Sequence, residues 1–267
     1  MRKPASLLCL ALLVAACSKG EGDAAPAAQS SASRVKPAAN GARTPAPEAS
    51  GVSASLPLPD LAACRTIPVA SDADLYRKRP IGVPPEFAGI MRTDMARIAV
   101  STLSGKTVCI DANWMEAIDA AELSPDGRFA RFQWAGNEAG GHIVVDRSGA
   151  GVSFDTGNRP VPSPSRRLVA ALEYSESGFG SLNGFGVWQV SDSPMHEIAR
   201  LPVPEGLTDW RMHGWRDNTC VPLSAVRFDD LAGDFAPGKE PRQYFVAAAG
   251  SKGWQIIPGE ADACPAP

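Results

Sequence analysis

The sequence predicts an all-β domain built from successive antiparallel hairpins. From residue 97 onward, short runs rich in β-branched and aromatic residues alternate with turns of Gly, Pro, Ser and Asp. No helical periodicity persists over about ten residues. The paired runs recur at similar intervals, which indicates an internal repeat. Of the 267 residues, 44% are hydrophobic and 21% are charged, which is typical of a globular chain.

Each predicted hairpin joins two β-rich runs through a turn that contains Gly or Pro. The four hairpins are Arg97–Ser101 with Lys106–Ile110, His142–Asp146 with Val152–Asp155, Phe185–Val190 with His196–Leu201, and Tyr244–Ala248 with Trp254–Ile257. Single strands are predicted at Phe129–Trp134, Leu168–Tyr174 and Thr219–Phe228. We expect helix only in short pieces, near Asp72–Arg77, Trp114–Ala120 and Phe228–Ala232.

A turn motif precedes the single strands. Ser124-Pro125-Asp126-Gly127 leads into the first, Ser163-Pro164-Ser165-Arg166 leads into the second, and Asp217-Asn218 is a degenerate third copy. Pro fixes φ, while Asp and Gly accept the turn and left-handed conformations that reverse a strand tightly. A strand, such a turn and three more strands in about 40 residues resemble a blade of the TolB-like and WD40-like β-propellers.

The resemblance implies a β-propeller-like array of antiparallel hairpins over residues 57–267, with about four or five blades. That number is small for a propeller, so an incomplete array is included in the prediction. A β-sandwich with similar hairpins is the alternative. Residues 57–95 are irregular and rich in Pro, and apart from the short helix expected near Asp72–Arg77 no element is assigned to them.

The chain begins with the pattern of a targeting segment. Arg2 and Lys3 precede an apolar run, Leu7–Val14, which is shorter than the roughly 20 residues that a membrane-spanning helix needs. Residues 1–16 are therefore predicted to be a signal peptide. Val14-Ala15-Ala16-Cys17 resembles the bacterial lipobox, which implies cleavage before Cys17 and acylation of its thiol and amino group. An ordinary secretory peptide is the alternative.

The resemblance to the lipobox also implies a destination. Several acyl chains on one residue anchor a protein stably, because each buried CH₂ contributes about 0.8 kcal/mol. Ser18, rather than Asp, follows the cysteine, and by the sorting rule of Gram-negative lipoproteins this favours the outer membrane. We therefore expect a lipid-anchored protein of the cell envelope that faces the periplasm.

Residues 17–56 are predicted to be a lipidated cysteine and a disordered linker. Of the 39 residues from Ser18 to Leu56, 11 are Ala, 7 Ser, 4 Gly and 4 Pro, and none is aromatic. A segment with so little surface to bury cannot offset the entropy cost of ordering. Its span as a flexible coil would be about 35 Å. A segment that folds on a partner is the alternative.

The charge excludes several partners. The formal net charge is −3 for the whole chain, −5 without Arg2 and Lys3, and −6 for residues 57–267, because the linker contributes +1. No run of five basic residues occurs. Nucleic acid is therefore not an expected partner, and contact with the membrane is expected through the N-terminal lipid alone.

The cysteines predict two disulfides. Cys9 leaves with the signal peptide and Cys17 carries the lipid, which leaves four cysteines in an exported chain: Cys64, Cys109, Cys220 and Cys264. Three connectivities are possible. Cys64 with Cys109 and Cys220 with Cys264 are favoured because their loops are short, and Cys64 with Cys264 is the rival pairing. No C-x-x-C motif is present for a zinc or redox site.

No residue pattern indicates catalysis, a cofactor or a metal. His142, His196 and His213 lack the spacing of a zinc motif, and G-x-S-x-G does not occur. Asp229, Asp230 and Asp234 are expected to be solvated, in the longest polar interruption of the repeats. The densest aromatic and cationic cluster is a candidate binding surface for a glycan or peptide: Trp210, Arg211, His213, Trp215 and Arg216. Core packing is the other interpretation of its tryptophans.

Together these patterns predict a lipid-anchored envelope protein that acts as a binding or protein-interaction scaffold, with an envelope protein or glycan as its partner. The alternative is an envelope hydrolase or lyase that acts on a glycan or peptide. Two carboxylates in one deep pocket would favour the enzyme. An apolar surface patch would favour the interaction module.

Overall fold

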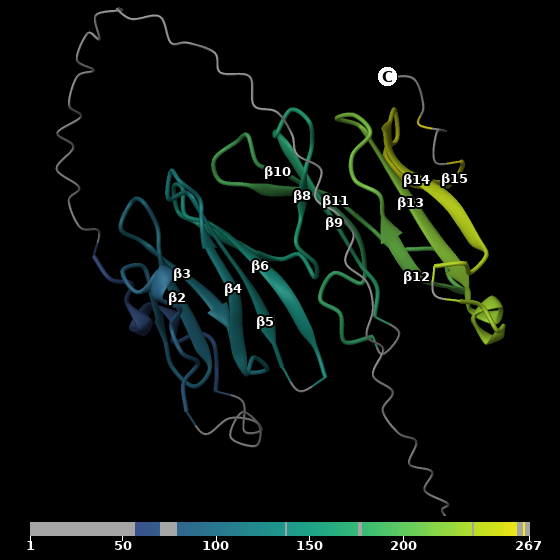
Figure 1. Ribbon diagram of the computed structural model, residues 1–267. Helices are drawn as coiled ribbons and strands as arrows, with labels where there is room; N and C mark the ends of the chain where they lie inside the picture. Colours follow the sequence, from purple (N-terminus) through teal and green to yellow (C-terminus); the bar gives the residue numbers. More distant parts are fainter. Residues whose placement is uncertain are drawn as a thin grey trace, which may run out of the picture. The chain divides into compact units, whose positions relative to one another are not determined.

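Strands dominate the folded part of the protein. The computed structural model describes residues 57–69, 79–136, 138–175, 178–236, 238–260 and 264. These residues contain fifteen strands in four antiparallel sheets, with three short 3-10 helices (Figure 1). The prediction of an all-β fold is confirmed. The predicted signal peptide, Cys17, the linker up to residue 56 and the helix predicted at 72–77 lie outside the described residues.

Each sheet is a meander, in which strands that follow one another in the chain also pair with one another. Sheet 1 contains β1 (Met91–Thr93), β2 (Arg97–Ser101) and β3 (Thr107–Asp111). Sheet 2 contains β4 (Ala117–Leu123), β5 (Phe129–Ala135), β6 (Gly140–Asp146) and β7 (Val152–Asp155). Sheet 3 contains β8 (Val161–Pro162), β9 (Leu168–Glu173), β10 (Gly184–Gln189) and β11 (His196–Leu201). Sheet 4 contains β12 (Leu207–Met212), β13 (Cys220–Arg227), β14 (Arg242–Gly250) and β15 (Gly253–Pro258).

The four predicted hairpins are the last two strands of the four sheets. Four sheets agree with the lower end of the predicted number of blades, and sheet 1 has three strands where the others have four. Among the described residues, no strand of sheet 1 pairs with sheet 4. The structure therefore fits an incomplete propeller-like array. It also fits the sandwich alternative, in which sheets likewise pack face to face.

A hydrophobic core fills each space between neighbouring sheets, because side chains alternate between the two faces of a strand. Ile98, Phe132 and Val145 belong to the core between sheets 1 and 2. Val187, Leu223 and Phe245 belong to the core between sheets 3 and 4. The core between sheets 2 and 3 has fewer buried members: Val144, Val169, Ala171, Leu182, Trp188 and Met195. We call this boundary the 2–3 seam.

An ion pair between a buried carboxylate and a partly buried guanidinium joins the two sides of the 2–3 seam. The Arg128 guanidinium, just before β5, donates to both carboxylate oxygens of Asp146 at 3.0 and 2.7 Å, and it also donates to the Asp192 carbonyl. Asp146 ends β6 and is fully buried, and it accepts the Met195 N–H at 2.7 Å. Burial alone would raise the pKa of Asp146. These hydrogen bonds lower it by more, so the net shift is downward from the ordinary value of 3.8. The pair therefore stays charged at neutral pH and joins sheet 2 to the start of β11.

The repeated turn motif has the same geometry in sheets 2 and 3. Ser124 accepts the Gly127 N–H on its carbonyl at 2.7 Å and the Phe129 N–H on its hydroxyl at 2.8 Å. Ser163 accepts the Arg166 and Leu168 N–H groups in the same way, at 2.8 and 3.2 Å. Both motifs connect the first strand of a sheet to the second. Asp217, the degenerate third copy, lies at the corresponding place in sheet 4 and accepts the Thr219 N–H at 2.6 Å.

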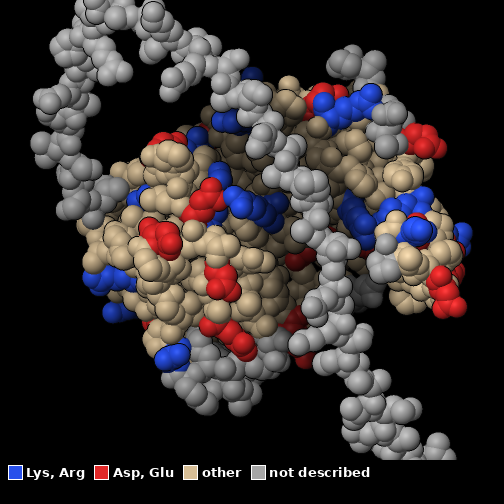
Figure 2. All heavy atoms as spheres, viewed as in Figure 1, with Lys and Arg blue, Asp and Glu red and all other residues tan. Residues whose placement is uncertain are grey.

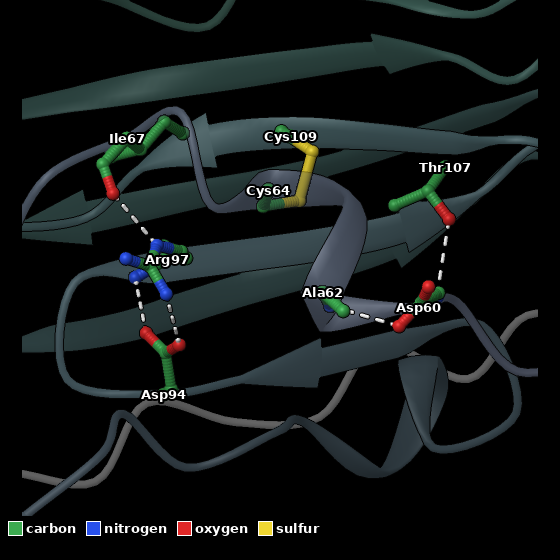
Figure 3. The surroundings of a disulfide bond; sticks show 8 residues. All are labelled: Asp60, Ala62, Cys64, Ile67, Asp94, Arg97, Thr107 and Cys109. Atoms are coloured by element: carbon green, nitrogen blue, oxygen red, sulfur yellow. Dashed lines mark hydrogen bonds and ion pairs between the residues drawn. A yellow bond between two sulfur atoms is a disulfide. The ribbon is translucent and has the colours of Figure 1, made fainter.

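Both favoured disulfides form, each on an end sheet of the array. Cys64 and Cys109 are joined with Cα atoms 5.3 Å apart, and Cys220 and Cys264 with Cα atoms 5.8 Å apart. The 3-10 helix η1 (Leu61–Cys64) lies along β2 and β3 (Figure 3). Cys264 packs against Cys220, Val246 and Ala248 of sheet 4. End repeats have no neighbour on one face, so these cross-linked segments act as caps.

Two short-helix predictions have different outcomes. The 3-10 helix η3 (Phe228–Ala232) confirms the first. A helix at Trp114–Ala120 is wrong, because strand β4 begins at Ala117 and pairs with β5, and the Glu116 N–H donates to the Ala135 carbonyl at 2.7 Å. The Ala-rich sequence has helical propensity, but pairing with a buried neighbouring strand overrides it. A third 3-10 helix, η2 (Pro85–Phe87), precedes β1 and packs Phe87 against Phe132.

Candidate interaction surface

The predicted cluster of Trp210, Arg211, His213, Trp215 and Arg216 lies on β12 and in the turn that follows it, and its members are divided between two faces. Trp210 packs against Phe245 at 5.1 Å between ring centres, and Trp215 packs edge-on against Trp254 at 5.8 Å. Both tryptophans are partly buried and pack against the core between sheets 3 and 4. The Trp215 indole N–H also donates to the Val161 carbonyl at 2.8 Å, which links the two sheets.

Arg211 and His213 alternate with these core residues and are exposed. Arg211 donates to Asp209 at 2.8 Å, and the His213 Nε2 lies 2.8 Å from the Ser224 hydroxyl. Arg216 is exposed in the turn before β13, where its backbone N–H donates to the Cys220 carbonyl at 3.0 Å. The structure thus brings Arg211 and His213 onto one face and places the tryptophans of the cluster on the other.

A bulge at Asp209 explains the uneven alternation of β12. The pairing with β13 shifts register between Thr208 and Arg211, and Asp209 has a φ of 45°. Its carboxylate accepts hydrogen bonds from Arg211 and Arg242. Burial raises the pKa of Asp209, but the two guanidinium groups lower it more, so the net shift is downward. Asp209 was not among the predicted site residues.

The other predicted candidates lie apart. His142 is buried in β6, whereas His196 and His213 are exposed on β11 and after β12. The described residues contain no group of three or more side chains placed to hold a metal ion. Of the three pockets described here, one is lined by Glu205 and one by Asp209 as their single carboxylates, and the third has no acidic lining residue.

The insertion between β13 and β14 carries large apolar side chains on the surface. Phe228, Leu231 and Phe235 are 62%, 42% and 47% exposed, and they fall within nine residues. The two most exposed aromatic residues outside the insertion, Trp114 and Phe179, lie apart from each other, before β4 and in the loop between β9 and β10. Scattered apolar residues are ordinary on a protein surface, but a local group of them indicates a binding site.

We call residues 228–236 the apolar insertion. Its backbone is held by two hydrogen bonds. The Phe228 N–H donates to the Gly206 carbonyl, just before β12, at 3.1 Å, and the Gly233 N–H donates to the Asp230 carbonyl at 3.4 Å. Asp229, Asp230 and Asp234 accompany the apolar side chains, and the segment contains no Lys or Arg. The insertion therefore offers apolar groups within an acidic setting.

A pocket of about 410 Å³ lies beside the apolar insertion. Leu231 lines it together with Asn158 from the connection between sheets 2 and 3, Tyr174 just after β9, and Trp210 and Asp209 of sheet 4. The Trp210 Nε1 is buried and makes no hydrogen bond. Across the face seen in Figure 2, basic and acidic groups are interspersed among uncharged residues. The insertion is thus a local apolar group next to a partly polar pocket, and it stands on the last sheet of the array.

No protein-family model matches the chain, and no curated protein matches its sequence. Within the described part of the chain, no helix is both long and apolar enough to cross a membrane.

Proposed function

We propose that this protein is a lipid-anchored protein of the bacterial cell envelope, and that its folded domain is a non-catalytic scaffold that binds another envelope protein. The observation that carries the proposal is the apolar insertion, where Phe228, Leu231 and Phe235 are exposed together. Protein interfaces have an apolar, aromatic centre with a polar rim, which is the composition of this segment. The acidic rim favours a partner with an apolar recess and basic residues around it.

Two features support the envelope location. The sequence from Val14 to Cys17 resembles a lipobox, and the folded domain contains two disulfides, which persist in oxidising compartments. Anchoring through Cys17, with Ser18 after it, would hold the domain at the outer membrane, facing the periplasm. We also propose that the four sheets are blades of an incomplete array related to the TolB-like and WD40-like repeats. Each sheet is a meander, and the turn motif recurs between the first and second strands of a sheet.

The hydrolase alternative has no observation to favour it. A glycosidase of the common type would need two carboxyl groups about 5 to 9.5 Å apart across one substrate site. Each described pocket has at most one carboxylate in its lining. The insertion is therefore the better starting point for an experiment.

Site-specific photocrosslinking in native envelopes tests the proposal. A photoreactive phenylalanine analogue replaces Phe235 in one strain and Phe179, which is 58% exposed in a loop of sheet 3, in a control strain. We expect one defined protein adduct from position 235, identified by mass spectrometry, and none from position 179. An absence of any specific adduct at position 235, or the same adducts from position 179, would contradict binding through the insertion.

A further inference from the structure

A second site lies at the 2–3 seam, outside the apolar insertion. The seam opens into a cleft of about 340 Å³, within the range of about 300–1,000 Å³ found for small-molecule pockets. Its lining is Phe129, Arg131 and Val144 from sheet 2, Arg159 and Pro160 from the connection to sheet 3, and Pro162, Arg166, Val169, Val190 and Met195 from sheet 3 and its loops. Ligand sites occur preferentially where two structural units meet, as they do here.

The wall of the cleft is apolar. Phe129, Val144, Val169, Val190 and Met195 also belong to the core of the seam or pack against it. They come from both sheets, so the apolar surface is continuous across the seam. An apolar group that enters the cleft would lose its contact with water against side chains that are already packed in place.

The cleft is positively charged, although residues 57–267 carry a net charge of −6. Three arginines line it and no acidic residue does. Among the described residues, Glu122 is the one carboxylate paired with them, at 2.6 Å from Arg159 and 3.8 Å from Arg131. Three guanidinium groups against one carboxylate leave a local charge of about +2.

The guanidinium groups also have hydrogen-bonding capacity left over. Each guanidinium carries five N–H donors. Within the described residues, these three side chains donate a single hydrogen bond, from Arg159 to Glu122. In the same part of the chain, Arg166 forms no ion pair. Arg131 also lies over the Phe129 ring, 5.5 Å from its centre, so its charge is held next to the apolar wall.

Arg166 occupies a backbone position that suits another residue. It has a φ of 57° in the turn motif, where the equivalent residue of sheet 2 is Gly127 with a φ of 69°. Gly adopts this left-handed conformation without steric cost, whereas Arg does not. Backbone strain of this kind gathers at functional sites. A basic side chain at this position points to a role for its charge.

We propose that the cleft at the 2–3 seam binds a small amphipathic anion, in which a carboxylate or phosphate head meets Arg131, Arg159 and Arg166 and an apolar body packs on the wall. Carboxylate and phosphate share the planar or tetrahedral oxygen pairs that a guanidinium fork binds with two hydrogen bonds. A free inorganic ion lacks the apolar body and a neutral alkyl compound lacks the head. Both are expected to bind more weakly than the amphipathic anion.

His142 offers a second readout near the cleft, because it lies in β6 two residues before the lining residue Val144. It is buried in β6, and burial, then Arg159 and Arg131, lower its pKa to about 4, whereas Asp155 and Glu122 raise it. An anion bound between Arg131 and Arg159 would offset part of their positive charge. Binding is therefore expected to raise the pKa of His142, which NMR titration of the imidazole measures.

The test uses the full chain with Cys17→Ser, so that no attached lipid competes for the cleft. Titration calorimetry compares octanoate and octyl phosphate with 1-octanol and with inorganic phosphate. We expect at least one amphipathic anion to bind at least tenfold more tightly than both 1-octanol and inorganic phosphate. The tighter of the two anions then identifies the head group. Equal binding of 1-octanol would overturn the role of the charge, and equal binding of inorganic phosphate would overturn the role of the wall.

Variants locate the binding. Arg159→Ala with Arg166→Asn removes two charges, and Asn tolerates the left-handed backbone at position 166. Arg200→Ala is the matched control, because Arg200 is an exposed arginine of β11 that pairs with Glu197 and does not line the cleft. We expect the double variant to bind at least tenfold more weakly and the control to bind as the parent does. Equal losses in both, or a His142 pKa unchanged by saturating ligand, would overturn the assignment.

Discussion

The buried imidazole of His142 makes the stability of the domain depend on pH in a window of its own. The pKa of His142 falls from 6.5 to about 4 on folding, first because burial disfavours the charged ring and then because of Arg159 and Arg131. Between these two values the unfolded chain binds a proton that the folded chain does not. The contribution of neutral His142 to the free energy of unfolding is therefore fully present above pH 6.5 and is lost as the pH falls toward 4.

The magnitude follows from the shift. One pKa unit corresponds to about 1.36 kcal/mol, so the change from 6.5 to about 4 corresponds to about 3 kcal/mol between pH 7 and pH 4. The pKa of Asp146 is lowered below 3.8, so its contribution is lost only at more acidic pH. The two groups can thus be separated by the pH at which each acts.

Urea unfolding at several pH values measures the effect, with His142→Gln as the comparison. Gln is neutral throughout, so the variant is expected to lose about 3 kcal/mol less than the parent between pH 7 and pH 4, whatever its stability at pH 7. The disulfides stay oxidised in both proteins. Parallel curves for the parent and the variant over this range would refute the buried, neutral state of His142.

Three further predictions concern the ion pair, the caps and the anchor. Asp146→Ala leaves the partly buried Arg128 without its partner and should destabilise the domain by about 3 to 5 kcal/mol, measured by urea unfolding at pH 7; a loss under 1 kcal/mol would contradict the role of the pair at the seam. Removing the disulfide of Cys220 and Cys264 by a double Ser substitution should cost about 2 to 5 kcal/mol, and the same change at Cys64 and Cys109 should cost a similar amount, because the loops have sequence separations of 44 and 45. Unchanged melting temperatures would show that the caps are dispensable. Cys17→Ser should move the protein from the membrane fraction to the soluble fraction of the cells, and unchanged fractionation would remove the proposed anchor.

The hairpins could be predicted from the sequence because their signals are local, and the cap disulfides because their loops are shorter than the alternatives. Period-two runs and Gly or Pro turns lie within about fifteen residues of one another in each hairpin. The disulfide pairing follows from loop length, since Cys64 and Cys220 each join the nearer of the remaining cysteines. Such patterns predict the structure correctly where the local preference of the chain agrees with the global fold.

The first strand of each sheet could not be assigned a range from the sequence. β1 and β8 have only three and two residues, which is too short to show alternation. β4 and β12 are longer, but a bulge shifts the register in each, and Ala120 and Asp209 have φ values of 46° and 45°. A bulge interrupts the period-two pattern on which strand prediction depends.

The two candidate sites differ in how much of each could be predicted from the sequence. The polar interruption after β13 marked the region of the apolar insertion, but the exposure of Phe228, Leu231 and Phe235 required the structure. The cleft at the 2–3 seam had no sequence signal. Arg131, Arg159 and Arg166 come from a strand, a connection and a turn, and only the packing of sheet 2 on sheet 3 brings them to one cleft.

Recovery of the partner from native envelopes tests the proposed scaffold most directly. Quantitative mass spectrometry compares affinity purifications of the parent, Phe228→Ser with Phe235→Ser, and Phe179→Ser as the exposed-aromatic control. These exposed positions should change stability by no more than about 0.5 kcal/mol. The account predicts one envelope protein whose recovery falls at least tenfold in the double variant and is unchanged in the control. Equal recovery of every co-purified protein from all three would contradict it.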